Sequence, residues 1–337
     1  VYAQRKFESG AHRVQRVRQT VPVAQAGQLT LLYPQWVPGH HGNTGDVSKL
    51  AGLQVRAGTQ SLPWRRDTLN PSAFHVLVPP GVAQLELSFD YLSPLGRDGG
   101  RVEVTRQILG VQWNEVLLYP AGHDASLIRV QPRLKLPAGW QQGTALRAPD
   151  GGLPQADAEG WVAYRALSVE TLVDSPVFAG RHLQRIELDA PGTPRPVALN
   201  IVADKPEQLK ATPAQIDAHR ALVQQADKLF GVRPWRQYDF LLALSEQFGG
   251  IGLEHHESSE NGVRGNYFQD WDKAVRAREL LPHEFAHSWN GKFRRPADLN
   301  TPDFHTPMQN SLLWVYEGLT EYWGHVLAAR AGLTTAA

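Results

Sequence analysis

Three residues in the last quarter of the sequence have the types and spacing that metal-assisted hydrolysis requires. His283, Glu284 and His287 match the pattern H-E-x-x-H within LLPHEFAHSWNGKFRRP, residues 280–296. Helix positions i and i+4 lie on one face, so both imidazoles can bind one ion. Glu284 lies about 100° around the helix from His283, where it can accept a proton from a water without becoming a ligand. Pro282 predicts that the helix begins or kinks just before these residues.

The pattern alone leaves an alternative open, in which two surface histidines flank a helix start by chance. A third ligand would favour the metal site, and the segment LWVYEGLTEYW, residues 313–323, offers Glu317 and Glu321 at helical spacing. The apolar run 313–316 predicts a buried setting, where a carboxylate is costly unless it is paired or binds a cation. We therefore predict Glu317 as the third ligand. Glu321 is predicted to accept the free ring N–H of a ligand histidine, or else to be an ordinary exposed helix charge.

Two histidines and one carboxylate are the ligand set of a catalytic zinc site with one open position. Zinc lowers the pKa of a bound water to roughly 7, which suits a neighbouring carboxylate as general base. The sequence has no cysteine, so thiolate metal sites and cysteine nucleophiles are excluded. These observations predict one Zn²⁺ per chain, with Glu284 as the catalytic base.

A glycine-rich segment, FGGIGLEHHESS at residues 248–259, carries a further candidate site. Gly249, Gly250 and Gly252 lack side chains, so the backbone and a substrate can approach closely, and we predict that Gly249 and Gly250 bind substrate. Glu254 follows them, and a carboxylate there can pair with the α-ammonium of a peptide, as in an aminopeptidase. The two histidines after Glu254 are adjacent on a predicted strand and point to opposite faces, so we do not expect them to share a metal.

The elements that must position these residues fall into two groups, and the first 190 or so residues indicate β-structure. In 84–92, Leu85, Leu87, Phe89 and Tyr91 share one face, the period-two pattern of a half-buried strand. Many short strands separated by Pro and Gly predict an antiparallel β-sandwich. The predicted strands are 28–36, 53–58, 73–81, 84–92, 133–140 and 182–190.

After a strand at 195–204, the pattern changes to that of a mixed α/β segment. A helix is predicted over 212–231, with Thr212 as N-cap, Pro213 at the first helical position, Gln215 completing a capping box and Gly231 at the end. A strand at 237–246 and a helix at 310–332 follow. We therefore predict an α+β fold.

The predicted domains are a β-rich domain over 1–195 and a mixed α/β domain over 196–337. Formal net charge is +1 with both signs interspersed, which gives no reason to expect nucleic acid as a partner. No apolar run approaches the roughly 18 residues of a membrane span. The chain therefore reads as soluble. It begins inside a strand pattern without an initiator Met, which fits a processed N-terminus, and removal of an export signal to the periplasm is one interpretation.

Together these motifs resemble the glycyl aminopeptidase family of zinc metallopeptidases, gluzincin-type relatives of aminopeptidase N and thermolysin. The resemblance is carried by HEFAHSWNGKFRRPADL (283–299), LWVYEGLTEYW (313–323), GGIGLEHHESS (249–259), DSPVFAG (174–180) and YPQWVPGHHGN (33–43). It implies a β-rich N-terminal domain followed by a thermolysin-like catalytic domain. It also implies zinc ligation by His283, His287 and Glu317, base catalysis by Glu284 and amine anchoring by Glu254.

The activity that this resemblance implies is removal of an N-terminal Gly or other small residue from peptides with a free N-terminus. The family continues through further helices, so the chain is expected to be the front part of a longer protein. Two alternatives remain. One is a zinc endopeptidase of the same class, and the other is a catalytically incomplete fragment that binds peptides or proteins.

Overall fold

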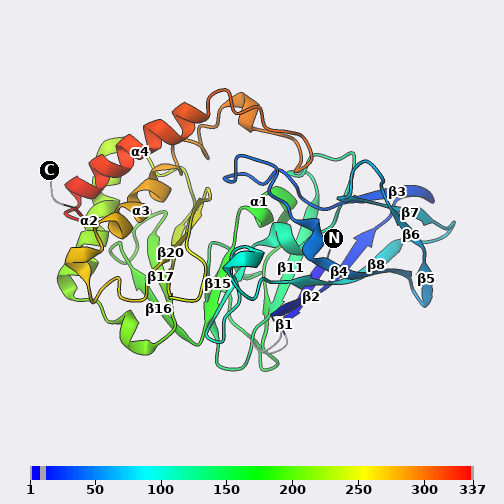
Figure 1. Cartoon of the computed structure of the whole chain (residues 1–337), viewed down its shortest axis with the longest axis horizontal. Coiled ribbons are helices and arrows are strands. Elements are labelled where there is room, and N and C mark those ends of the chain that lie inside the picture. Colours follow the sequence, from blue (N-terminus) through cyan, green and yellow to red (C-terminus); the bar gives the residue numbers. More distant parts are fainter. Residues whose placement is uncertain (1, 8–12, 335–337) are drawn as a thin grey trace.

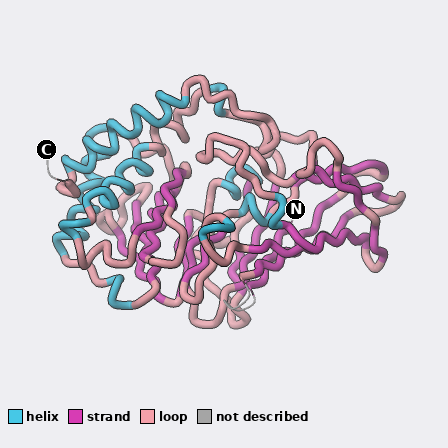
Figure 2. Tube along the Cα trace, in the orientation of Figure 1, coloured by secondary structure: helices cyan, strands magenta, loops and turns pink. Residues whose placement is uncertain are grey.

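The structure is a computed structural model that describes residues 2–7 and 13–334. Its strands extend across the whole molecule, whereas the three long helices gather at one end (Figures 1 and 2). Among the described residues, no helix combines the length and apolarity that crossing a membrane requires.

The elements have the following bounds: β1 Tyr2–Phe7, β2 Val14–Pro22, β3 Gly27–Leu32, β4 Leu50–Ala57, β5 Gln60–Leu62, β6 Trp64–Arg66, β7 Ala73–Val78, β8 Gln84–Leu92, β9 Ile108–Val111, β10 Tyr119–Pro120, β11 Arg129–Lys135, β12 Gln141–Thr144, β13 Trp161–Ala163, β14 Leu167–Ser168, α1 Val169–Val173, β15 Val177–Gly180, β16 His182–Glu187, β17 Val197–Ala203, α2 Pro213–Phe230, β18 Tyr238–Leu244, β19 Ile251–Glu254, β20 Ser258–Val263, α3 Val275–Ala286 and α4 Leu313–Arg330.

The N-terminal half is β-rich and mostly antiparallel, as predicted. One sheet has the order β13-β11-β1-β2-β8-β4-β5, with β14 also pairing to β11, and a second has the order β10-β3-β7-β6. Side chains from both sheets form one core. Strand β8 shows why: Leu85, Leu87, Phe89 and Tyr91 are all buried, which confirms the period-two pattern. The one parallel pair described in this half joins β1 to β11.

A five-stranded sheet with the order β16-β17-β18-β20-β19 forms the centre of the second half. Strands β17, β18 and β20 are parallel, and β19 is an antiparallel edge strand. Strand β16 pairs with β17, although it precedes the boundary predicted after residue 195. A small sheet, β12-β15-β9, packs against this sheet through Ile108 and Phe178, which meet Val202 and Leu241. The two halves therefore share a core.

Helix α2 follows its sequence signals closely. The Thr212 hydroxyl accepts a hydrogen bond from the Gln215 N–H, while the Gln215 side chain accepts one from the Thr212 N–H. Gly231 ends the helix with φ +74, in the left-handed region that glycine adopts without strain. Thus the predicted capping box and stop are both confirmed.

Helix α4 lies along α3, as Figure 1 shows. Its buried face comprises Tyr316, Thr320, Gly324 and Leu327, spaced three or four residues apart. The prediction of a buried setting across 313–316 was wrong, because Trp314 is 73% exposed and only Tyr316 of the four is buried. Consecutive helix residues point about 100° apart, so a run of four cannot all face inward.

Candidate active site

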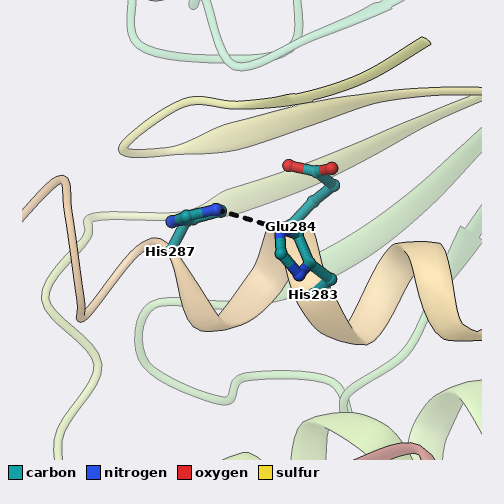
Figure 3. A group of neighbouring side chains, drawn as sticks. All are labelled: His283, Glu284 and His287. Carbon is teal, nitrogen blue, oxygen red and sulfur yellow. Dashed lines mark hydrogen bonds between the residues drawn. The ribbon is translucent and has the colours of Figure 1, made fainter. Parts of the chain in front are cut away.

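Helix α3 carries the H-E-x-x-H residues at its C-terminal end. Pro282 lies in the interior of this helix and not in its first turn. His287 is the C-cap residue and keeps a helical backbone conformation, so both histidines share one side of the helix. The Glu284 side chain projects in a different direction from the two imidazoles, towards the hairpin formed by β19 and β20 (Figure 3).

Three donor atoms meet in front of α3. The Nε2 atoms of His283 and His287 are 3.2 Å apart, and Oε2 of Glu317 lies 3.5 and 3.4 Å from them. Ligands about 2.05 Å from a tetrahedral zinc are separated from one another by roughly 3.3 Å. The triangle therefore fits one zinc ion without rearrangement, and its donor types suit zinc chemically.

Close packing of α4 on α3 brings Glu317 to the histidines. A Cβ on Gly324 would lie 3.0 Å from the Cα of His283, so glycine is needed for the helices to approach this closely. The side-chain amide of Asn290 donates to the backbone carbonyls of Val315 and Tyr316 at 3.0 and 3.2 Å. These contacts fix the first turn of α4 beside the end of α3.

Each of the two histidines has an oxygen atom close to its outer ring nitrogen. Nδ1 of His283 lies 2.8 Å from a Glu321 carboxylate oxygen, and Nδ1 of His287 lies 3.1 Å from the carbonyl of Asn290. When Nδ1 carries the proton and donates it, Nε2 keeps its lone pair for a metal. Glu321 thus lies close to His283 Nδ1, but this nitrogen has no hydrogen-bond partner of good geometry among the described residues, so the acceptor role of Glu321 stays a prediction.

Glu254 and Glu284 face the same space from two elements, and their acidities differ. Burial, together with the nearby Glu254 and Glu317 carboxylates, raises the pKa of Glu284 well above its ordinary value. Burial also opposes ionisation of Glu254, but the charges of His287 and Lys292 outweigh it and lower its pKa. Such opposite shifts suit a proton acceptor beside a permanent anion.

Gly252 explains how Glu284 fits against the edge strand. A Cβ built on Gly252 would lie 2.4 Å from Oε1 of Glu284 and 2.6 Å from Cδ1 of Leu280. Any side chain at this position would displace the carboxylate. Gly252 was expected, with Gly249 and Gly250, to let a ligand approach the backbone; its contact with Glu284 was not predicted.

The N-terminal half contributes His41, which the sequence analysis also missed. Its Nε2 lies 2.6 Å from Oε1 of Glu317 and 4.0 Å from the Glu254 carboxylate. Its ring packs edge-on against Tyr316, whose hydroxyl donates a hydrogen bond to Glu254. His41 belongs to the quoted segment 33–43, but no local spacing in that segment reveals a partner almost 280 residues away.

Ion pairs between charged side chains connect the N-terminal half to the second half near the site. The buried Lys292 ammonium lies 2.6 Å from Asp174, which also pairs with Nδ1 of His255 at 3.1 Å. The other ring nitrogen of His255 lies 3.3 Å from the buried Glu260, which also pairs with Arg101. His255 is therefore committed to two carboxylates, in keeping with the expectation that it is not a metal ligand.

The two glycines predicted to bind substrate lie in different surroundings. A Cβ on Gly249 would lie 2.6 Å from the Arg101 side chain, and its N–H donates to the carbonyl of Val102. This position is therefore occupied by the N-terminal half, which leaves no room there for a substrate. Gly250 is open on the side where a Cβ would point, with only the Gly262 carbonyl oxygen nearby at 3.7 Å.

Two solved structures share this fold. An aminopeptidase N family protein from Idiomarina loihiensis matches with TM-score 0.81 and 19% identity, over 99% of this chain and 55% of that chain. An M1 zinc metallopeptidase from Deinococcus radiodurans matches with TM-score 0.52 and 16% identity, over 98% of this chain and 70% of that chain. The chain thus spans about half the length of the first structure, and the fold is that of this class of peptidases.

The family assignment comes from sequence. Residues 5–181 match the model of the peptidase M61 N-terminal domain, and residues 276–337 match that of M61 glycyl aminopeptidase. The chain belongs to the M61 glycyl aminopeptidase family, as the motifs predict. No protein with a curated description matches the chain.

Proposed function

We propose that the protein is a zinc-dependent aminopeptidase that removes the first residue, Gly or another small one, from peptides with a free N-terminus. The observation that carries this proposal is the triangle of His283, His287 and Glu317 donors, with Glu284 and Glu254 facing the same space. When bound, zinc would polarise the peptide carbonyl and lower the pKa of water. The remaining chemistry belongs to the side chains.

Glu284 has the role of general base. It accepts a proton from the attacking water and returns it to the departing amine, and a pKa raised by burial improves its basicity. Glu254 binds the substrate α-ammonium, since its lowered pKa keeps it anionic while the Tyr316 hydroxyl holds its orientation. The base and the anchor thereby fix the peptide at both ends of its first residue.

The enclosure of Glu254 favours exopeptidase over endopeptidase activity. His41, Tyr316 and Gly39 surround its carboxylate, and a Cβ on Gly39 would lie 3.1 Å from both carboxylate oxygens. Residues that precede the first one would have to pass through these groups. An endopeptidase would cleave N-acetylated and free peptides alike, whereas we expect acetylation to abolish cleavage.

The central test uses Glu284→Gln, which keeps the size of the side chain and removes its basicity. We expect bound zinc to remain at one per chain and kcat to fall by roughly 10³-fold, in the range for loss of a general base. Near-normal turnover would contradict the assigned role. A wild-type protein that binds zinc but cleaves no Gly-initiated peptide would instead identify a peptide-binding module.

A further inference from the structure

A cavity of about 900 Å³ lies beside the proposed site, at the start of β19. Gly250, just before β19, lines one wall, and Ala274 and Ala277, at the start of α3, line another. Glu284 lies two helical turns further along α3 than Ala277. The cavity and the proposed base therefore occupy neighbouring stretches of the same two elements.

The cavity opens on the same side of β19 as Glu284. Alternate residues of an extended strand share a face, so positions 250, 252 and 254 point the same way. At position 252 this side is filled by Glu284, whereas at position 250 a Cβ would meet only the Gly262 carbonyl oxygen at 3.7 Å. The cavity therefore begins beyond the side chains of Glu284 and Leu280, which cover this side of β19 at position 252.

The two anchors set the direction of a bound peptide. Its ammonium would lie beside Glu254 and its first carbonyl near Glu284, which abuts Gly252. A peptide that enters at residue 254 and passes residue 252 continues towards residue 250, antiparallel to β19. Four residues of extended chain span about 13 Å. The third to fifth residues of the peptide would therefore reach the cavity.

The walls of the cavity carry three cations and two carboxylates. Arg264, Lys273 and Arg276 are exposed there, and among the residues that the structure describes none of the three has an ion-pair partner. Two acidic residues also line the cavity, but each accepts a local hydrogen bond: Glu246 from a backbone N–H at 3.2 Å and Asp270 from a side-chain amide at 2.7 Å. An anionic group in the cavity would find free cations.

We propose that this cavity is a substrate subsite that selects acidic side chains at the third to fifth positions of the peptide. The inference rests on the proposed function, which supplies the direction of the peptide. It narrows the substrate class to peptides with a small first residue followed, two or more positions later, by Asp or Glu.

The first test compares kcat/KM for the peptides Gly-Ala-Glu-Glu-Ala, Gly-Ala-Gln-Gln-Ala and Gly-Ala-Lys-Lys-Ala. With two or three exposed ion pairs, we expect the Glu peptide to exceed the Lys peptide roughly fivefold at low salt. The ratio should fall towards one at 0.5 M salt, where screening is strong. The double variant Arg264→Glu and Arg276→Glu should invert the preference, while Arg65→Glu, far away on β6, should keep it.

The second test measures binding without turnover. In Glu284→Gln, the Kd values of the Glu and Lys peptides should differ in the same direction, which separates the subsite from the chemistry. Absence of cleavage of every peptide would refute the proposed function and still leave these Kd values informative. Equal Kd values in this variant, or a preference unchanged by the double charge reversal, would overturn the subsite.

Discussion

Replacement of Gly252 by alanine is a sharp test of where Glu284 acts. The added Cβ would lie 2.4 Å from the Glu284 carboxylate, and ordinary van der Waals contact begins at 3.4 Å, so the carboxylate must move by about 1 Å. A misplacement of this size can cost roughly 10²-fold in rate. We therefore expect kcat to fall about 100-fold, equivalent to about 2.7 kcal/mol of transition-state stabilisation.

The assay should separate kcat, KM and metal content. Hydrolysis of glycine p-nitroanilide gives kcat and KM, and competition with a chromogenic chelator gives zinc affinity, which we expect to stay near the wild-type value. Gly318→Ala serves as the matched control, because no atom lies within 4 Å of its added Cβ, and it should keep full activity. If Gly252→Ala retained kcat within threefold of wild type, the contact would not position the base. A rise in KM alone would show that the strand moved instead.

Three further predictions concern side chains around and beyond the site. His41→Ala should weaken zinc binding by 10- to 100-fold through loss of its hydrogen bond to Glu317, and His41→Gln should restore part of it; unchanged chelator competition would count against this. Asp174→Asn leaves the buried Lys292 ammonium without its counter-ion and should lower the free energy of unfolding in urea by about 3 kcal/mol; a loss below 1 kcal/mol would contradict the pairing. Burial lowers the pKa of His219 to about 4. Between pH 6.5 and pH 4 the unfolded state therefore binds one more proton than the folded state. As the pH falls across this range, the protein should lose about 3 kcal/mol of the stability that it has above pH 6.5. His219→Gln should flatten this pH dependence, and an unchanged profile would refute the assignment.

The sequence predicted those features that local chemistry determines. Thr212, Gln215 and Gly231 bound α2 because caps act within one turn. The buried face of β8 followed from the alternation of apolar and polar residues along this strand. Helical spacing placed His283 and His287 on one side of α3, as the structure has them. Glu317 was chosen for a buried setting that its 37% exposed side chain does not have, yet its carboxylate lies 3.5 and 3.4 Å from the two histidines, and their role as metal ligands stays a prediction.

Features that depend on packing between distant segments were beyond local patterns. His41 approaches Glu317 only because the segment around residue 41 folds over the second half, and Gly249 packs on Arg101 for the same reason. The apolar run at the start of α4 misled the burial prediction, since one side of this helix lies against α3 and Trp314 lies on the other. The contacts of His41 with Glu317 and of Gly249 with Arg101 produce no periodic pattern in the sequence.

The ion pair between Asp174 and Lys292 has a practical consequence for protein engineering. Its two members come from different halves, as do His41 and Glu317. A truncated protein that contains only the second half would retain every proposed metal ligand. It would, however, leave the buried Lys292 ammonium without its counter-ion and Oε1 of Glu317 without its hydrogen bond to His41. A transfer of this half to another scaffold would therefore also have to include the segment around His41 and Asp174, which precedes β15.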